Sequence, residues 1–377
     1  MQYFIKAGID IMDENYIVPE SYDPAVDVWT ALSETKKPII MYGMGDGADK
    51  ILSVMEKYGI EPADFMASDE FVRGHSFRGH RVKKLSEIEE LYNDFIVVIC
   101  FGSALPDVME RIDRIREKYE TYAPDVPVVG DGLFDGDYIS DHEFEIMQLK
   151  SYLADDASRE CLDVLMKYRI TGDIGTLRKC ESPLQEMIGM LNIGPDETYV
   201  DLGAYNGDTV EAFLKLTGKR FRHIYALEPD RRNFSKLRRR LYYISSALLT
   251  AKNAAAWSSD TKLIFNNKAG RGSALITDPE KSDGRGYEID ALSVDSLLDG
   301  KPATLIKYDV EGSEHEALLG SEETIRKYKP RLIVSLYHRV EDLVELPLLI
   351  HELNPGYRMF LRHHPYIPAW DTNLYCI

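Results

Sequence analysis

The chain has 377 residues and a formal net charge of −18 at pH 7, with 44% hydrophobic and 29% charged residues. This length leaves room for two domains of roughly 150 residues each, and the composition is that of a folded globular protein. The negative charge disfavours nonspecific binding to nucleic acid or to an anionic membrane surface. Because no apolar run approaches the ~20 residues of a membrane span and the first residues lack a signal-peptide pattern, we expect a cytoplasmic protein.

A glycine-rich turn follows the first buried strand, which we expect over residues 38–42. Gly43, Gly45 and Ala48 fit the pattern G-x-G-x-x-A of a dinucleotide-binding turn. Asp69 follows the next expected strand, where such sites place an acid for the ribose. Hydrophobic patterning predicts further strands over 64–67, 95–99 and 126–129, and helices over 49–58, 87–91 and 108–119.

This alternation predicts one Rossmann-like α/β domain over residues 1–132. The order of its parts resembles small Rossmann-like domains that precede sugar-modifying enzymes. Two interpretations stay open: a nucleotide or nucleotide-sugar site, or a fold that serves only packing or dimerisation. Residues 133–182 then have apolar positions at helical spacing, which predicts a helical connector, and a second domain is expected over 183–377.

The second domain is organised around the stretch 199–209, which is expected to form a strand, a tight turn and the start of a helix at Asp208. Gly203 and Gly207 permit backbone angles and a close ligand approach that a Cβ would block. Asp201 precedes the first glycine, an arrangement that departs from the dinucleotide pattern. A carboxylate there suits a ligand with an amino or sulfonium cation, which favours S-adenosylmethionine.

The next expected strand, 224–227, ends in Glu228, about 20 residues after the turn, where α/β nucleotide sites place an acid for the ribose hydroxyls. Residues 252–257 and 263–265 are expected to form paired strands, and a loop at 270–274 could close over a ligand. The residues predicted to bind the cofactor are Asp201, Gly203, Ala204, Asn206, Gly207, Asp208, Glu228 and Asn253.

Four motifs occur together in this second domain: V-D-L-G-A-x-x-G-D-T at 200–209, E-P-D at 228–230, S-V-D-S-L at 293–297 and I-K-Y-D-V-E-G at 306–312. The combination resembles the FkbM family of S-adenosylmethionine-dependent methyltransferases over about residues 183–377. The resemblance implies an α/β fold with a seven-stranded mixed sheet whose last strand is antiparallel. It also implies S-adenosylmethionine as cofactor and methylation of a hydroxyl oxygen of a sugar or natural product.

Methyl transfer to a hydroxyl requires alignment of the acceptor and loss of its proton. Asp309, at the end of its strand, is the first candidate for the catalytic carboxylate and Glu311 the second, although either could instead cap a helix. His338 ends the next strand and could take the proton, or it could be a satisfied structural histidine. His363 or His364 could join these residues around a metal, but no ligand spacing demands one and no metal is expected.

The competing hypothesis places the function in the N-terminal domain, as a nucleotide-sugar-binding module or an NAD-dependent enzyme that uses the turn after residue 42. In a joint interpretation, that domain recognises the substrate that the second domain methylates. The partner expected in either case is a small-molecule or saccharide acceptor, without nucleic acid or membrane. An oligomer stays possible.

Overall fold

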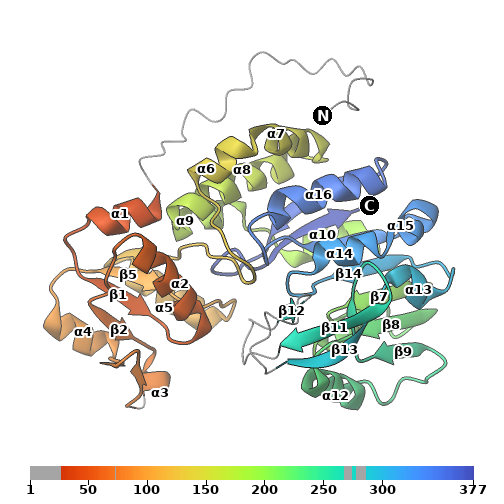
Figure 1. The fold of residues 1–377 in the computed structure, drawn as a ribbon, viewed down its shortest axis with the longest axis horizontal. Helices are drawn as coiled ribbons and strands as arrows, with labels where there is room; N and C mark the ends of the chain where they lie inside the picture. Colours follow the sequence, from red (N-terminus) through yellow and green to blue (C-terminus); the bar gives the residue numbers. More distant parts are fainter. Residues whose placement is uncertain (1–26, 73, 267–273, 277–285) are drawn as a thin grey trace.

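A computed structural model describes residues 27–72, 74–266, 274–276 and 286–377. Figure 1 shows two α/β bodies side by side, the N-terminal one in red and orange and the larger one in green and blue, with helices from the middle of the chain beside them. No helix in the described ranges is long and apolar enough to cross a membrane. Residues 270–273 of the expected ligand-covering loop lie outside the described residues.

The N-terminal sheet has four parallel strands in the order β2-β1-β5-β6. Its central strands are apolar and buried on both faces, since one set of side chains packs against α1 and α2 and the alternate set against α4 and α5. The elements of this body are α1 (Val28–Glu34), β1 (Ile39–Tyr42), α2 (Asp46–Lys57), β2 (Asp64–Met66), α3 (Asp69–Val72), β3 (Ser76–Phe77), β4 (His80–Arg81), α4 (Leu85–Leu91), β5 (Ile96–Ile99), α5 (Pro106–Arg116) and β6 (Glu120–Tyr122).

The fourth strand of this sheet is β6, so the strand predicted over 126–129 is wrong. Pro127 within that stretch has no backbone N–H to donate to a strand ladder. Its neighbours instead reach across to the larger body, where the Val129 N–H donates to the His338 carbonyl at 2.9 Å. A second link pairs Ser103, after β5, with Ile367 in an antiparallel bridge.

The connector consists of α6 (Gly136–Asp141), α7 (Glu143–Tyr152), α8 (Asp156–Thr171), α9 (Ile174–Leu177) and a 3₁₀ helix (Arg178–Cys180). Its apolar residues share one core with the larger sheet. The buried Arg169 guanidinium donates to the carbonyls of Leu336 and Val340 at 3.2 and 3.3 Å and forms an ion pair with Asp125. The domain boundaries expected at residues 132 and 182 stay a proposal, and this shared core favours grouping the connector with the larger body.

The larger sheet has seven strands in the order β16-β17-β15-β14-β7-β8-β9, and β17 runs antiparallel to both of its neighbours. This confirms the predicted seven-stranded mixed sheet with an antiparallel last strand. Its elements are α10 (Leu184–Leu191), β7 (Thr198–Leu202), α11 (Asp208–Leu216), β8 (His223–Leu227), α12 (Arg231–Arg240), β9 (Leu249–Lys252), β14 (Leu305–Tyr308), α14 (Glu314–Leu319), α15 (Glu322–Tyr328), β15 (Arg331–Ser335), α16 (Asp342–Leu353), β16 (Met359–His363) and β17 (Thr372–Cys376).

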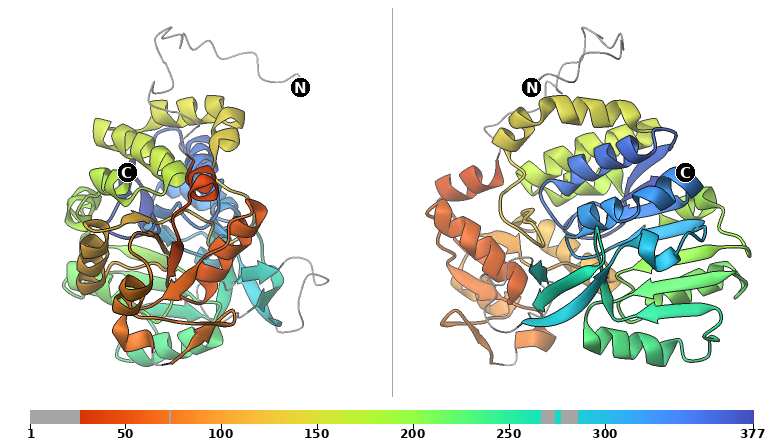
Figure 2. Two further views of the ribbon diagram at one scale, coloured as in Figure 1. Left: turned by 90° about the vertical axis from the view of Figure 1, so that its left-hand side faces the viewer. Right: turned by 45° about the vertical axis from the view of Figure 1, so that its right-hand side comes forward.

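A smaller sheet is inserted between β9 and β14, in the order β10-β13-β11-β12. It comprises β10 (Ala254–Ala256), β11 (Thr261–Asn266), β12 (Ala274–Ile276) and β13 (Gly286–Leu292), followed by α13 (Val294–Leu298). The predicted pairing of 252–257 with 263–265 is wrong, because β13 lies between them. Asp260 holds β13 there by accepting a hydrogen bond from Ser293 N at 3.0 Å. The right-hand view of Figure 2 shows the ribbon of β11 and β13 between the N-terminal body and the main sheet.

Candidate functional site

A cavity of about 750 Å³ lies at the carboxyl ends of β7, β8 and β14, the edge at which open α/β sheets bind ligands. Its walls come from both bodies, since Val128 joins residues of the larger sheet. The lining residues are Val128, Gly203, Tyr205, Asp208, Thr209, Glu228, Pro229, Asp230, Arg232, Asn233, Lys236, Ala254, Ala255, Ala256, Phe265, Asp309, Val310, Glu311, Tyr337, Tyr366, Trp370 and Asp371. Of the predicted cofactor residues, Gly203, Asp208 and Glu228 therefore line the cavity.

The turn after β7 depends on its glycines. Gly203 has a φ of 80°, and a Cβ there would overlap the carbonyl oxygen of Asp309 on the neighbouring strand. Gly207 has a φ of 86° and is the N-cap of α11. The helix therefore begins at Asp208, as expected from the sequence, with Gly207 as its N-cap. Close approach of β7 and β14 explains why the first glycine cannot carry a side chain.

Glu228 lines the cavity at the end of β8 and is 5% exposed. Its two carboxylate oxygens accept backbone hydrogen bonds from Tyr205 and Asp230, each at 2.8 Å. Burial raises the pKa of Glu228 to about 8, against these hydrogen bonds. Asn253 does not line the cavity; its amide donates to the carbonyls of Glu228 and Pro229 at 2.8 and 2.9 Å and so positions the carboxylate.

Asp201 is fully buried beneath the turn and does not line the cavity. It accepts a hydrogen bond from the Thr209 hydroxyl at 2.5 Å and lies 4.0 Å from Lys307 Nζ. Burial raises the pKa of its carboxyl group. Ala204 is likewise buried, and Asn206 accepts a hydrogen bond from Arg240. These three predicted cofactor residues support the turn and are not among the residues that line the cavity.

Lys307 connects the two carboxylates at the ends of β7 and β14. Its Nζ lies 2.8 Å from Asp309 Oδ2, and the Tyr337 hydroxyl donates to Asp309 Oδ1 at 3.2 Å. Burial alone would raise the pKa of Asp309, but Lys307 and then His338 lower it to about 2. A carboxylate held this strongly as an anion is a weak base, so it is better suited to orienting a cation or a hydroxyl than to removing a proton.

His338 is surrounded by three carboxylates, and its side chain is 1% exposed. Its Nδ1 is 2.9 Å from Glu314 Oε1, and its Nε2 is 3.6 Å from Asp309 Oδ1 and 3.7 Å from Glu311 Oε2. Burial alone would lower the pKa of His338, but the carboxylates, Glu314 foremost, raise it to about 10. The carboxylates thus favour the protonated imidazole, and the role of His338 in taking a proton stays a prediction.

The loop that carries Glu311 is held by hydrogen bonds to the Glu314 carboxylate. Glu311 and Gly312 have φ angles of 53° and 90°, and Glu314 accepts backbone hydrogen bonds from Val310 at 2.7 Å and Gly312 at 3.0 Å. The N-cap of α14 is Ser313, without a side-chain cap hydrogen bond, so neither Asp309 nor Glu311 has the capping role that the sequence left open to them. The left-handed Glu311 residue costs conformational free energy, and such strained residues concentrate at functional sites.

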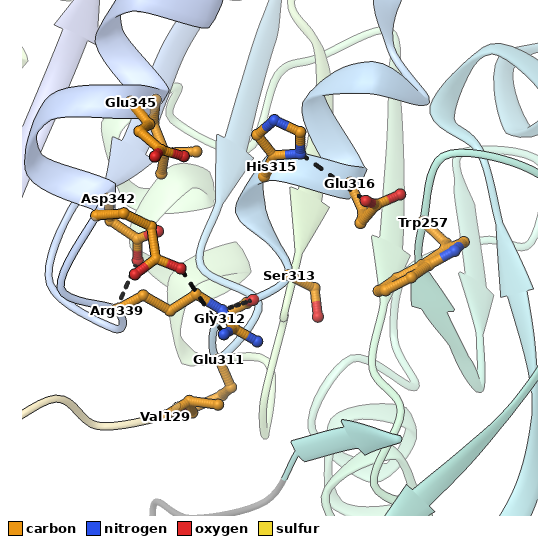
Figure 3. A pocket seen from close by; sticks show the side chains of 12 residues that line it. Val129, Trp257, Glu311, Gly312, Ser313, His315, Glu316, Arg339, Asp342 and Glu345 are labelled. Carbon is orange, nitrogen blue, oxygen red and sulfur yellow. Dashed lines mark hydrogen bonds and ion pairs between the residues drawn. The ribbon is translucent and has the colours of Figure 1, made fainter. Parts of the chain in front are cut away.

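A second cavity, of about 410 Å³, adjoins the first at Glu311, which lines both. Figure 3 shows Arg339 and Asp342 on one side of it and Trp257 on the other. Arg339 donates through Nε to the Gly312 carbonyl at 2.7 Å. The full lining is Val129, Trp257, Glu311, Gly312, Ser313, His315, Glu316, Arg339, Glu341, Asp342, Glu345 and Leu346, which makes this cavity strongly acidic.

The late histidines do not join the catalytic candidates. His363 is fully buried, its Nδ1 lies 3.2 Å from Thr372 Oγ1, and burial lowers its pKa to about 3. His364 bridges the Ser182 carbonyl and the Tyr375 hydroxyl at 2.8 and 2.6 Å. Among the described residues, the group whose ligand atoms could hold a metal ion is Asp309, Glu314 and His338, within 4.8 Å of one another.

The N-terminal turn has the backbone that its glycines predict, with φ angles of 123° at Gly43 and 105° at Gly45. Two carboxylates, Asp46 and Asp49, stand in the first turn of α2, where a pyrophosphate would have to bind. The expected ribose acid, Asp69, is exposed and lies 3.4 Å from Lys84 Nζ. Neither cavity described above is lined by Gly43, Gly45, Ala48 or Asp69.

Several site residues were missed from the sequence. Lys307 could have been found from the sequence, because a lysine inside an otherwise apolar, buried strand indicates a carboxylate partner. Glu314 and Tyr337 stand within or beside the quoted motifs but have no distinguishing spacing. Trp257 lines the second cavity and Trp370 the first, and the sequence analysis gave neither of them a role at the site.

Residues 201–368 match the family model described as the methyltransferase FkbM domain. A crystal structure of methyltransferase FkbM from Methylobacillus flagellatus KT is similar with a TM-score of 0.72 at 23% identity, covering 94% of this chain and 96% of that chain. This similarity shows a shared fold across both bodies.

Two further solved structures are similar over about half of this chain. Precorrin-6y C5,15-methyltransferase from Geobacter metallireducens GS-15 has a TM-score of 0.33 at 11% identity, covering 51% of this chain and 86% of that chain. Fibrillarin from Aeropyrum pernix, in complex with natively bound S-adenosyl-L-methionine, has a TM-score of 0.32 at 10% identity, covering 51% and 74%. Comparison with curated proteins found no significant match.

Proposed function

We propose that this chain, whose residues 201–368 match the model of the methyltransferase FkbM domain, binds S-adenosylmethionine in the 750 Å³ cavity and methylates a hydroxyl oxygen of a sugar or natural product. The observation that carries the proposal is Glu228. Its buried carboxylate is fixed by two backbone N–H groups at the end of β8, and each oxygen keeps a lone pair for a ribose hydroxyl.

The residues present fit this cofactor. The glycine turn after β7 opens the wall of the cavity beside Glu228, and the small side chains of Ala254, Ala255 and Ala256 leave room for a flat ring. When bound there, S-adenosylmethionine would supply an electrophilic methyl group. The Asp309 carboxylate, which faces the same cavity, would orient the acceptor hydroxyl, and alignment of this kind contributes several kcal/mol to such transfers.

The acceptor would enter through the second cavity, which meets the first at Glu311. Five carboxyl side chains line it, Glu311, Glu316, Glu341, Asp342 and Glu345, against one arginine. Such a lining repels anions, so phosphorylated or nucleotide-linked sugars are disfavoured as acceptors. The half-buried ring of Trp257 lines this cavity and offers an apolar face for a sugar ring or an aliphatic natural product. We therefore propose a neutral or amine-bearing acceptor.

The test is methyl transfer from S-[methyl-³H]adenosylmethionine to a panel of hydroxyl compounds sorted by charge. Glucosamine, N-acetylglucosamine and glucosamine 6-phosphate form one matched series, and larger glycosides extend it. We expect labelled product with neutral or amine-bearing members and least with phosphorylated ones. A preference for phosphorylated acceptors would overturn the acceptor class, and absence of S-adenosylmethionine binding would overturn the function itself.

A further inference from the structure

Two cations of α12 lie at the 750 Å³ cavity. Arg232 and Lys236 both line it, and their spacing of four residues places them on one face of the helix. Among the described residues that line this cavity, they are the ones with a positive charge. Both residues are exposed, so neither is needed to fill the core.

These two cations have no carboxylate partner in the part of the chain that the structure describes. Lys236 Nζ donates to the Asn233 side-chain oxygen at 3.3 Å and lies 6.0 Å from the centroid of the Tyr205 ring. Farther along the same helix, by contrast, Arg240 lies 3.7 Å from a carboxylate oxygen of Glu211. In a chain with 63 acidic and 45 basic residues, cations that stay unpaired beside a cavity are available for an anionic group of a ligand.

The packing of α12 against the turn after β7 determines where these cations lie. A Cβ at Gly207 would lie only 3.3 Å from Leu241 Cγ, so the end of the helix is in close contact with the turn. Tyr205, in the same turn, has its ring beside Lys236 and donates its backbone N–H to Glu228 at 2.8 Å. The cations are therefore on the β7 side of the carboxylate that is proposed to bind the ribose.

The proposed cofactor has a different chemistry on each side of its ribose. In the sheet, β8 lies between β7 and β9, and the alanines of β10 that leave room for a flat ring come directly after β9. A ribose at Glu228 with the adenine toward β10 directs the methionine part toward β7. That part carries an ammonium, a sulfonium and a single carboxylate. The acidic side chains of the cavity suit the two cationic groups, and Arg232 and Lys236 suit the carboxylate.

We propose that Lys236 and Arg232 bind the carboxylate of the methionine part of S-adenosylmethionine and make the cavity selective for ligands that carry this group. Guanidinium and ammonium groups both donate charge-assisted hydrogen bonds to a carboxylate. This inference rests on the proposed function, because it assigns a further part of the same cofactor site.

An anionic group on the acceptor is the other ligand chemistry that these cations suit. The second cavity, through which the acceptor is proposed to enter, meets the first at Glu311, after β14. The cations follow β8, and β7 lies between β14 and β8 in the sheet. This separation favours the cofactor carboxylate over an acceptor anion.

The experiment is calorimetric titration of the full chain with three ligands. These are S-adenosylmethionine, S-adenosylhomocysteine, which keeps the carboxylate but lacks the transferred methyl group, and decarboxylated S-adenosylmethionine, which lacks the carboxylate alone. Each of Lys236→Met and Arg232→Met should weaken binding of both carboxylate-bearing ligands by about three- to fivefold, the upper range for exposed ion pairs, and the double variant by about tenfold or more. The affinity for the decarboxylated ligand should stay unchanged or rise, because that ligand has only positive charges.

A matched control is the double variant Arg238→Met/Arg239→Met. It removes two positive charges from the same helix at exposed positions that do not line the cavity, so all three affinities should stay unchanged. Lys236→Arg keeps the charge and should retain most of the preference for the carboxylate. Equal losses in the cavity and control variants, or equal losses for ligands with and without the carboxylate, would overturn the proposal. Unchanged affinity for S-adenosylmethionine in Arg232→Met/Lys236→Met would also overturn it, and would leave these cations to an anionic acceptor.

The same titrations separate this inference from the proposed function. A wild-type chain that binds neither S-adenosylmethionine nor S-adenosylhomocysteine would refute both. Binding that Glu228→Ala weakens and Arg232→Met/Lys236→Met leaves intact would refute the carboxylate site alone.

Discussion

Glu228 shows how a single buried carboxylate couples the cavity to pH. In the ligand-free structure, burial holds its pKa at about 8, so the group is mostly protonated at neutral pH. Ribose hydroxyls donate hydrogen bonds to a carboxylate and stabilise its ionised form. Binding of the cofactor should therefore release a proton and become tighter as pH rises toward 8.

We predict that the affinity for S-adenosylmethionine rises about tenfold between about pH 7 and about pH 9, because the ionised fraction of a group with a pKa near 8 rises by that factor. Isothermal titration calorimetry across this range measures it. In the isosteric variant Glu228→Gln, which has no proton to lose, the profile should be flat. A wild-type affinity that falls with pH, or a slope that survives in Glu228→Gln, would contradict this role.

The sequence predicted which residues line the cavity better than it predicted the chemical role of each residue. Gly203, Asp208, Glu228, Asp309 and Glu311 do line the cavity, because strand ends of a parallel sheet meet at one edge. The role predicted for His338 stays a prediction, because its protonation depends on neighbours from other elements that the sequence does not place. Glu314, which dominates the surroundings of His338, has no distinguishing spacing in the sequence.

At the scale of elements, the contact between β7 and β14 sets the shape of the cavity. Gly203→Ala should destabilise the fold by about 1–2 kcal/mol for a left-handed alanine and by about 1–3 kcal/mol more for overlap with the Asp309 carbonyl. Denaturant unfolding measures the sum, and binding of S-adenosylmethionine should weaken as well.

Gly218→Ala is the matched control. Gly218 also has a positive φ, 60°, but a Cβ there meets open space, so only the backbone cost of about 1–2 kcal/mol should appear. Equal losses in the two variants would mean that the strand contact does not constrain the turn.

Strands and helices with strong hydrophobic periodicity were predictable from the sequence, whereas the pairing of strands within each sheet was not. The strands expected at 38–42, 64–67 and 95–99 correspond to β1, β2 and β5. The expected strand at 126–129 was wrong because its extended residues bond to the other body instead of completing a sheet. Pairing partners such as β10 and β13, more than 30 residues apart, depend on tertiary packing that local patterns do not encode.

At the scale of the whole molecule, the two bodies meet beside the cavity. The Ser103–Ile367 bridge joins their loops, and a Cβ at the neighbouring Gly102 would lie 2.6 Å from the ring of Trp370. A Cβ at Gly102 would also lie 2.9 Å from the ring of Tyr366. Both Trp370 and Tyr366 line the 750 Å³ cavity. The packing of the N-terminal body should therefore influence cofactor binding.

Gly102→Ala tests this coupling. We expect a loss of stability of about 1–3 kcal/mol from overpacking and a several-fold weaker affinity for S-adenosylmethionine, measured by thermal unfolding and calorimetry. The control Gly189→Ala, within α10 and facing open space, should keep or slightly raise stability and leave the affinity unchanged. An unchanged affinity in Gly102→Ala would show that the junction does not shape the cavity.

The most direct test of the central claim is calorimetric titration of the purified chain with S-adenosylmethionine and, separately, with NAD, in the wild type and in Glu228→Ala. We predict one site for S-adenosylmethionine with a dissociation constant in the micromolar range, weakened at least about tenfold by Glu228→Ala, and no heat from NAD. Binding of NAD alone, or an affinity for S-adenosylmethionine that Glu228→Ala leaves unchanged, would contradict the assignment of the cofactor to this cavity.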